Sequence, residues 1–221
     1  MTAFKGLIFD LDGVIANTAD LHFLAWQKIA QAIGGQLSRL QYKKLKGVSR
    51  MESLDLILLW NGIGLTPAHK EVLAQKKNQL YLRMIADLKP SDTLPGVLPF
   101  IRSARALNLR IALGSASQNA EAVLQALDMT KYFDVIVDGT QTVQSKPSPD
   151  VFLHGARRLA LQPTELVVFE DGIRGVEAAR AGEFAAVGVG DRDDFPTAHL
   201  VIPNFLKQHP EPLLAQLSHL R

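Results

Sequence analysis

Residues 4–13 have the sequence FKGLIFDLDG, in which a short apolar run ends in two aspartates and a glycine. Such a run is typical of a buried β-strand that stops at a polar loop. Side chains two positions apart on an extended chain point to the same side, so Asp10 and Asp12 are predicted to lie together at the carboxyl end of this strand, where open α/β sheets bind ligands. Asp-Gly is also a common turn dipeptide, so this segment alone does not separate a catalytic pair from a turn.

Apolar runs alternate with helical patterns through most of the chain. Besides residues 4–9, the runs that predict strands are 109–114, 134–138, 166–169, 185–189 and 199–202. The patterns that predict helices are 97–107, 119–128, 149–160 and 173–181, with a terminal helix within 207–221 that begins near Pro210. Strands that alternate with helices form a parallel sheet covered on both faces. We therefore expect an α/β fold with a three-layer, Rossmann-like core.

The alternation is interrupted between residues 15 and 90. Only helical patterns occur there, at 19–33, 38–45, 50–60 and 67–86. This stretch contains 11 Lys and Arg against 5 Asp and Glu, whereas the remainder contains 13 against 17. A basic segment beside an acidic one suggests two lobes, one that attracts anions and one that holds a cation. The predicted domains are a core of residues 1–14 and 91–221 and an inserted α-helical cap of residues 15–90.

The composition is that of a globular protein. The chain has 221 residues, of which 47% are hydrophobic and 21% charged, and a chain of this length buries roughly 70% of its unfolded surface. The absence of cysteine from the sequence excludes disulfides, thiolate zinc sites and cysteine nucleophiles. There is no apolar stretch of about 18 residues, and Asp10 and Asp12 interrupt a run that would otherwise resemble a signal peptide. We therefore expect a cytoplasmic location and no membrane partner.

A second acidic pair, Glu170-Asp171, directly follows the apolar run at 166–169. Three or four oxygen ligands that converge from two strand ends suit one Mg²⁺. A helix pattern begins soon after this pair, so stabilisation of acidic residues by a helix N-terminus is the alternative explanation for it.

Two further polar loops follow predicted strands. Ser115, Ala116 and Ser117 come after the run at 109–114, and their hydroxyl and N–H groups are suited to a phosphoryl oxygen, although a serine there is equally suited to cap a helix. Lys146 lies in the sequence SKPSP, where two prolines stiffen the loop. Its ammonium group would neutralise a phosphoryl group or remain an ordinary solvated lysine. Together with the two acidic pairs, these loops favour one phosphoryl-transfer site.

The order of these segments resembles the four motifs of the haloacid dehalogenase-like phosphotransferase superfamily, and the insert resembles its small helical cap. The resemblance covers essentially the whole chain. It implies that Asp10 is a nucleophile that forms an aspartyl phosphate, and that Asp12 is the general acid and base. It implies that Ser115 and Lys146 hold and neutralise the phosphoryl group. The implied metal ligands for one Mg²⁺ are Asp10, the backbone carbonyl of Asp12, Glu170 and Asp171.

Longer segments resemble the β-phosphoglucomutase family within that superfamily, namely residues 9–30, LKGVSRMESL at 45–54, KKN at 76–78 and SASQN at 115–119. They imply that the following residues bind substrate: Thr18, His22, Trp26, Lys46, Gly47, Val48, Ser49, Arg50, Ser53, Lys77, Ala116, Ser117, Gln118 and Asn119. Two positions depart from the family pattern, since Gln118 stands where a lysine is expected and Asn17 where an aspartate is usual. Gln118 removes a positive charge from the site of the phosphate that is not transferred, so we expect weaker binding of that phosphate or a different sugar preference.

The resemblance implies a mutase that interconverts β-D-glucose 1-phosphate and glucose 6-phosphate, with β-glucose 1,6-bisphosphate as activator and intermediate. It implies a monomer whose partner is a small sugar phosphate and not a nucleic acid. A sugar-phosphate or phosphoglycolate phosphatase with the same core and cap is the alternative. A phosphoryl-accepting receiver domain lacks a helical insert after its first strand, and a dinucleotide-binding module has only the glycines at 188 and 190 in its favour.

Overall fold

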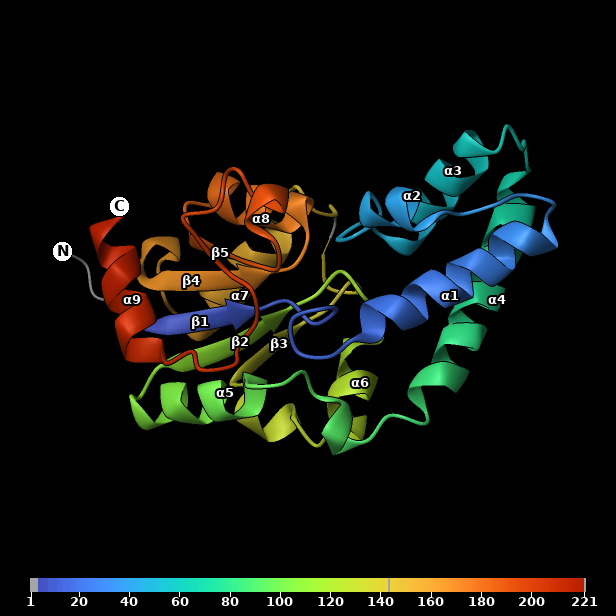
Figure 1. The fold of residues 1–221 in the computed structure, drawn as a ribbon. Coiled ribbons are helices and arrows are strands. Elements are labelled where there is room, and N and C mark those ends of the chain that lie inside the picture. Colours follow the sequence, from blue (N-terminus) through green and yellow to red (C-terminus); the bar gives the residue numbers. More distant parts are fainter. Residues whose placement is uncertain (1–3, 143, 221) are drawn as a thin grey trace.

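The computed structural model describes residues 4–142 and 144–220, which leaves residues 1–3, 143 and 221 of the predicted core outside the described part. Its sheet has the strand order β3-β2-β1-β4-β5-β6. The strands are β1 (Gly6–Phe9), β2 (Arg110–Gly114), β3 (Val135–Val137), β4 (Leu166–Glu170), β5 (Ala185–Val189) and β6 (Leu200–Ile202). All neighbouring pairs are parallel, which confirms the expected α/β fold. Because β1 lies between β2 and β4, the loops after these three strands meet at one edge of the sheet (Figure 1).

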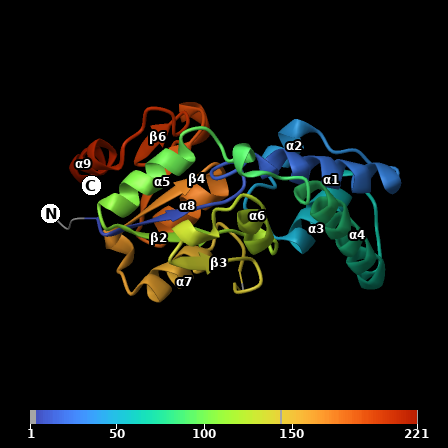
Figure 2. The same cartoon turned by 90° about the horizontal axis from the view of Figure 1, so that it is seen from below.

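Helices cover both faces of the sheet and complete the three layers (Figures 1 and 2). The helices of one face are α5 (Val97–Ala106), α6 (Ala120–Ala126) and α9 (Pro210–His219), and those of the other are α7 (Asp150–Leu159) and α8 (Ile173–Ala181). Side chains alternate along β1, so Leu7 and Phe9 pack into the first layer and Ile8 into the second. Short 3₁₀ helices lie in the connections: η1 (Pro90–Asp92), η2 (Thr130–Tyr132), η3 (Pro163–Glu165) and η4 (Arg192–Asp194).

The inserted stretch is helical, as predicted. It contains α1 (Thr18–Ala32), α2 (Arg39–Lys43), α3 (Arg50–Trp60) and α4 (Pro67–Ile85), which extend to one side of the sheet in Figure 1. The side chains of Ser38, Ser49 and Thr66 each accept a backbone N–H and so begin α2, α3 and α4. These helices bury a separate apolar cluster around Trp26 and Leu54. In the described part of the chain, no helix combines the length and the apolar character needed to cross a membrane.

The two segments that connect the helical insert to the sheet lie side by side. The backbone N–H of Leu94 donates to the carbonyl of Ile15 at 2.8 Å, and Ala16 forms an antiparallel bridge with Thr93. The insert is therefore attached along one narrow line, close to the loop that carries Asp10.

Gly96, the residue before α5, gives a test of how closely this helix start packs against the backbone of Phe205. It has a φ of +85°, and a Cβ there would lie 2.4 Å from the carbonyl carbon and oxygen of Phe205. Since this backbone has little room to move, we expect Gly96→Ala to lower the free energy of unfolding by about 2–4 kcal/mol. Gly62 has a φ of +65° with nothing within 4 Å, so Gly62→Ala is expected to cost only about 1–2 kcal/mol of backbone strain. Urea unfolding measures both variants, and equal losses would contradict the packing argument.

Candidate active site

The loop after β1 directs its two aspartates into one cleft between the sheet and the insert. The Oδ2 atom of Asp10 accepts a hydrogen bond from the backbone N–H of Asp12 at 3.0 Å. Gly13 has a φ of +85°, which lets the chain turn here. The Oδ1 atom of Asp12 accepts a hydrogen bond of 2.6 Å from the hydroxyl of Thr18, the first residue of α1. The Asp12 side chain is thus tied to the insert, while Asp10 remains with the core.

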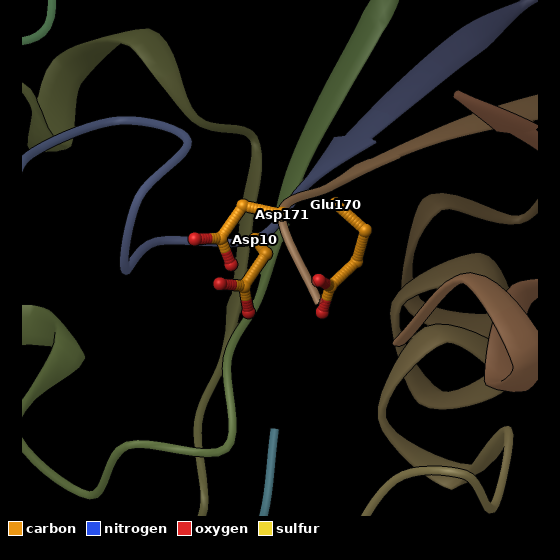
Figure 3. A group of neighbouring side chains, drawn as sticks. All are labelled: Asp10, Glu170 and Asp171. Atoms are coloured by element: carbon orange, nitrogen blue, oxygen red, sulfur yellow. The ribbon is translucent and has the colours of Figure 1, made fainter. Parts of the chain in front are cut away.

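Three carboxylates gather at the ends of β1 and β4, from Asp10, Glu170 and Asp171 (Figure 3). Each offers one oxygen, and these oxygens all lie within 4.8 Å of one another. Two glycines make room for them: a Cβ at Gly13 would lie 1.9 Å from Asp171 Oδ2, and a Cβ at Gly175 would lie 1.9 Å from Glu170 Oε1. A set of carboxylate oxygens is what Mg²⁺ prefers, so the cluster fits one such ion.

Lys146 lies against the same cluster and is fully buried. Its Nζ atom donates to Asp10 Oδ1 at 2.6 Å, to Glu170 Oε1 at 2.5 Å and to the carbonyl of Gly114 at 3.3 Å. Burial opposes the charged form of this lysine, but the negative charges of Asp10 and Glu170 outweigh that effect and raise its pKa above the usual value. The ammonium group therefore keeps its charge behind the wall of the cleft, against Asp10.

Burial dominates the acid-base behaviour of the two aspartates after β1. It raises the pKa of Asp10 well above its usual value, against the opposing charge of Lys146. It also raises the pKa of Asp12, against the hydrogen bond from Thr18 that favours the ionised form. A carboxyl group with a raised pKa is suited to carry a proton and release it.

Asp171 receives a lysine from the insert. The Nζ atom of Lys46 donates to Asp171 Oδ2 at 2.6 Å and to the backbone carbonyl of Asp171 at 3.2 Å. Burial raises the pKa of Asp171 to about 7 even though the charge of Lys46 lowers it. Neighbouring carboxyl groups in a buried place repel one another when ionised, which favours a bound cation.

The loop after β2 is shaped by its own hydroxyl groups. Ser115 Oγ accepts the N–H of Ser117 at 3.1 Å, and Ser117 Oγ accepts the N–H of Asn119 at 3.3 Å. Beneath this loop, a Cβ at Gly139 would lie 2.2 Å from the carbonyl oxygen of Ala116, so only glycine allows the approach. Ser115 is fully buried and supports the loop from below, whereas residues 116–119 face the cleft.

The cleft brings together most of the predicted site residues. Those that line it are Asp10, Asp12, His22, Trp26, Lys46, Gly47, Val48, Arg50, Ser53, Lys77, Ala116, Ser117, Gln118, Asn119 and Asp171. The others lie behind its wall: Thr18, Ser49, Ser115, Lys146 and Glu170. Among these, Ser49 caps α3 by accepting the N–H of Glu52 at 3.3 Å, and Thr18, Lys146 and Glu170 contact the aspartates or each other.

Three further residues of the cleft wall were not predicted as site residues, although two of them lie within the segments that carry the family resemblance. Ala19, Tyr42 and Leu45 also line the wall. Asn78 contacts the loop after β2, since its Oδ1 atom accepts a hydrogen bond of 2.9 Å from Asn119 Nδ2. Asn78 belongs to the KKN segment that carried the family resemblance, and this was the signal that pointed to it.

His22 and Lys77 form a buried pair on the insert side. The Nζ atom of Lys77 lies 2.5 Å from His22 Nδ1, and the His22 ring stacks on Tyr81 with ring centroids 3.9 Å apart. Burial and the charge of Arg50 lower the pKa of Lys77 to about 7. Burial and the charge of Lys77 hold the pKa of His22 well below its usual value. His22 is therefore neutral. The charged form of Lys77 lowers the stability of the fold, and it lies beside a cleft that suits anions.

Replacement of Lys77 tests how much its buried charge lowers the free energy of unfolding. In the unfolded chain this lysine loses its proton near its ordinary pKa of 10.5, whereas in the native chain it does so near 7. The loss of folding stability that the charged lysine causes is therefore complete below pH 7 and declines as the pH rises from 7 to 10.5. We expect Lys77→Met to raise the free energy of unfolding by about 1–3 kcal/mol at pH 6, with little gain near pH 10. Urea unfolding at both pH values measures the difference.

The matched control is Lys76→Met, because Lys76 is exposed on the same turn of α4. It is expected to leave the unfolding free energy within about 0.5 kcal/mol of the starting protein. A gain in Lys77→Met that does not vary with pH would contradict the argument from the lowered pKa.

This geometry agrees with comparisons to known proteins. The family model of the haloacid dehalogenase-like hydrolases matches residues 4–182, and the chain belongs to that family. Beta-phosphoglucomutase of Bacillus subtilis strain 168 is 40% identical to it over 200 residues, which cover 90% of this chain and 88% of the relative. The resemblance that the motifs indicated is thereby confirmed.

Solved structures and phosphatases are also similar to the chain. The crystal structure of beta-phosphoglucomutase from Clostridium difficile has a TM-score of 0.94 and 33% identity, with 98% of each chain covered. Fructose-1-phosphate phosphatase YqaB of Escherichia coli K12 is 34% identical over 186 residues, which cover 84% of this chain and 96% of the relative. Both mutases and phosphatases are thus relatives.

Proposed function

We propose that this chain is a β-phosphoglucomutase, which interconverts β-D-glucose 1-phosphate and glucose 6-phosphate. The observation that carries the proposal is the buried contact of 2.6 Å between Lys146 Nζ and Asp10 Oδ1. It joins an acceptor for phosphorus to a fixed cation directly behind the wall of a cleft that Lys46 and Arg50 also line. The likeness to the Bacillus subtilis and Clostridium difficile mutases supports the same reaction.

Asp10 is the proposed nucleophile. Its carboxylate oxygen forms a bond to phosphorus while the bond from phosphorus to the sugar oxygen breaks, which leaves an aspartyl phosphate. A carboxylate and a phosphate dianion repel each other, and Lys146 offsets this charge. The loop after β2, which lines the cleft with Ala116 and Ser117, is proposed to hold the other phosphoryl oxygens, with Ser115 as its buried support.

Asp12 is the proposed general acid and base. It gives a proton to the leaving sugar oxygen, and it later removes the proton from the sugar hydroxyl that accepts the phosphoryl group. Its raised pKa and its hydrogen bond from Thr18 support this role. The hydrogen bond from Thr18 also ties the position of Asp12 to α1 of the insert. We propose that this insert, residues 15–90, is a cap domain that closes over the site.

The proposed metal site consists of Asp10, Glu170, Asp171 and the backbone carbonyl of Asp12. One Mg²⁺ held there would supply charge neutralisation for the phosphoryl oxygens and the nucleophile. The clustered carboxylate oxygens and the two glycines that make room for them support this site.

Two transfers complete the proposed cycle. The aspartyl phosphate passes its phosphoryl group to the 6-hydroxyl of β-glucose 1-phosphate, and the resulting β-glucose 1,6-bisphosphate turns in the cleft. Asp10 then accepts the phosphoryl group from carbon 1, and glucose 6-phosphate leaves. Water must be kept from the aspartyl phosphate throughout, which a closed cap achieves. The monomeric state and the cytoplasmic location stay predictions.

A phosphatase that acts on sugar phosphates is the second candidate. Gln118 favours it, because a neutral side chain lines the cleft where the family pattern predicts a lysine for the second phosphate. The similarity to the Escherichia coli fructose-1-phosphate phosphatase also supports it.

A product assay separates the two candidates. The enzyme is incubated with β-glucose 1-phosphate, Mg²⁺ and a trace of β-glucose 1,6-bisphosphate, and glucose 6-phosphate and free phosphate are both measured. We expect glucose 6-phosphate as the main product, and loss of at least about 10⁴-fold in turnover for Asp10→Asn, with circular dichroism unchanged. Free phosphate without glucose 6-phosphate would establish the phosphatase instead.

Arg50 is expected to hold the phosphate that is not transferred. A planar guanidinium group on the cap wall is suited to this anion. We expect Arg50→Ala to raise KM about 10- to 100-fold with a smaller effect on kcat. Arg83→Ala is the control, because Arg83 is exposed on α4 of the same insert and does not line the cleft. A lower melting temperature for Arg50→Ala with unchanged KM would exclude this role.

A further inference from the structure

A cap carboxylate contacts the core beside the loop that carries Lys146. Glu52, in the first turn of α3, accepts a hydrogen bond of 2.8 Å from Ser145 Oγ through its Oε2 atom. Its Oε1 atom accepts a hydrogen bond of 3.0 Å from Arg174 Nη2, at the start of α8. Both oxygens of one side chain on the cap are therefore used by two side chains of the core.

Arg174 makes a second contact that involves Lys146 directly. Its Nε atom donates to the backbone carbonyl of Lys146 at 2.9 Å. Ser145 precedes Lys146 in the chain, so the peptide unit of this lysine is held on both sides. The ammonium group at the other end of Lys146 contacts Asp10 and Glu170.

We propose that Glu52, Ser145 and Arg174 form a latch through which closure of the cap fixes the position of Lys146, with Arg174 as a positioning residue. This inference rests on the proposed function. When Glu52 moves away with the cap, Ser145 and Arg174 lose the carboxylate that they share. The lysine loop is then held only from the core side, and Lys146 is fixed firmly against Asp10 only while the cap excludes water.

The latch is distinct from the contacts that substrate would make. None of its three side chains lines the cleft, among the residues that the structure describes. Among the other polar contacts between cap and core, Lys46 with Asp171 and Asn78 with Asn119 involve site groups, and Lys43 with Asp194 lies on the exposed surface. The latch can therefore be removed without removing a wall of the cleft. Glu52 and Arg174 keep 39% and 28% of their side chains exposed, so truncation leaves neither a cavity nor a buried charge.

The decisive measurement is how often a turnover ends in free phosphate instead of glucose 6-phosphate. Glu52→Ala, Arg174→Ala and the double variant are assayed with β-glucose 1-phosphate, Mg²⁺ and a trace of β-glucose 1,6-bisphosphate. We expect each single variant to raise the ratio of free phosphate to glucose 6-phosphate by about 3- to 10-fold. The double variant is expected to change the ratio by clearly less than the product of the two single effects, because both single variants break the contact between Glu52 and Arg174. A variant that is merely less stable loses both products equally.

Asp55→Ala is the matched control for the cap side. Asp55 lies on the same helix, α3, and its carboxylate contacts Lys70 at 2.6 Å, entirely within the cap. We expect its product ratio to equal that of the starting protein. Arg174→Lys gives a second comparison, because a lysine cannot contact Glu52 and the Lys146 carbonyl with a planar fork, and we expect it to restore less than half of the effect.

Hydrogen exchange measures the latch without any turnover. Faster exchange of residues 144–148 in Glu52→Ala and Arg174→Ala, but not in Asp55→Ala, supports the latch even if the product assay shows a phosphatase. Unchanged exchange in both variants overturns the latch, as do additive effects of the two substitutions on the product ratio. Failure of the proposed mutase function is seen separately, as an absence of glucose 6-phosphate with the starting protein.

Discussion

The site depends on one buried contact, in which the ammonium group of Lys146 lies between the carboxylates of Asp10 and Glu170. Removal of charges from water is expensive unless each is paired, so the lysine offsets the cost of burying both carboxyl groups. The sheet order supplies the two acids, because β1 and β4 are neighbours. Gly175 supplies the space, since any larger residue there would displace Glu170.

The insert of residues 15–90 is basic and the remainder of the chain is acidic, so their charges are complementary. Several contacts between the two involve groups of the proposed active site. Lys46 of the basic insert contacts the acidic cluster through Asp171, and Arg50 and Lys77 line the cleft, which suits phosphate groups. Glu52 is a cap acid that contacts a core base, which is the reverse of this trend. A pair with an acid on the insert and a base on the core favours one docking orientation, because a shifted insert would bring like charges together.

Much of this arrangement could be predicted from the sequence. The apolar runs before Asp10 and Glu170 were sufficient to place both at one edge of a parallel sheet, because carboxyl ends of neighbouring parallel strands meet there. The helical insert followed from the missing strands between residues 15 and 90. The α2 helix, Arg39–Lys43, is shorter than the predicted range 38–45, because Ser38 acts as its cap and residues 44–46 form a turn.

What could not be predicted depends on how the cap docks. Glu52 and Arg174 are 122 positions apart, and Asn78 and Asn119 are 41 apart. No local periodicity links such pairs, and no motif marks Tyr42 as a cleft residue. The position of Ser49 illustrates the same limit, because a serine before a helix is equally compatible with capping and with ligand contact until its neighbours are known.

The paired connections between Ile15 and Leu94 and between Ala16 and Thr93 restrict how the two lobes rotate. A single connecting segment would let the insert twist more freely, whereas two segments joined by a hydrogen bond and a backbone bridge resist torsion more than bending. A movement of the insert that is guided in this way would follow nearly the same arc each time and would bring the same side chains to a sugar of a given size. Selectivity for the shape of a ligand would then depend partly on residues 15–16 and 93–94, two short backbone segments that do not line the cleft.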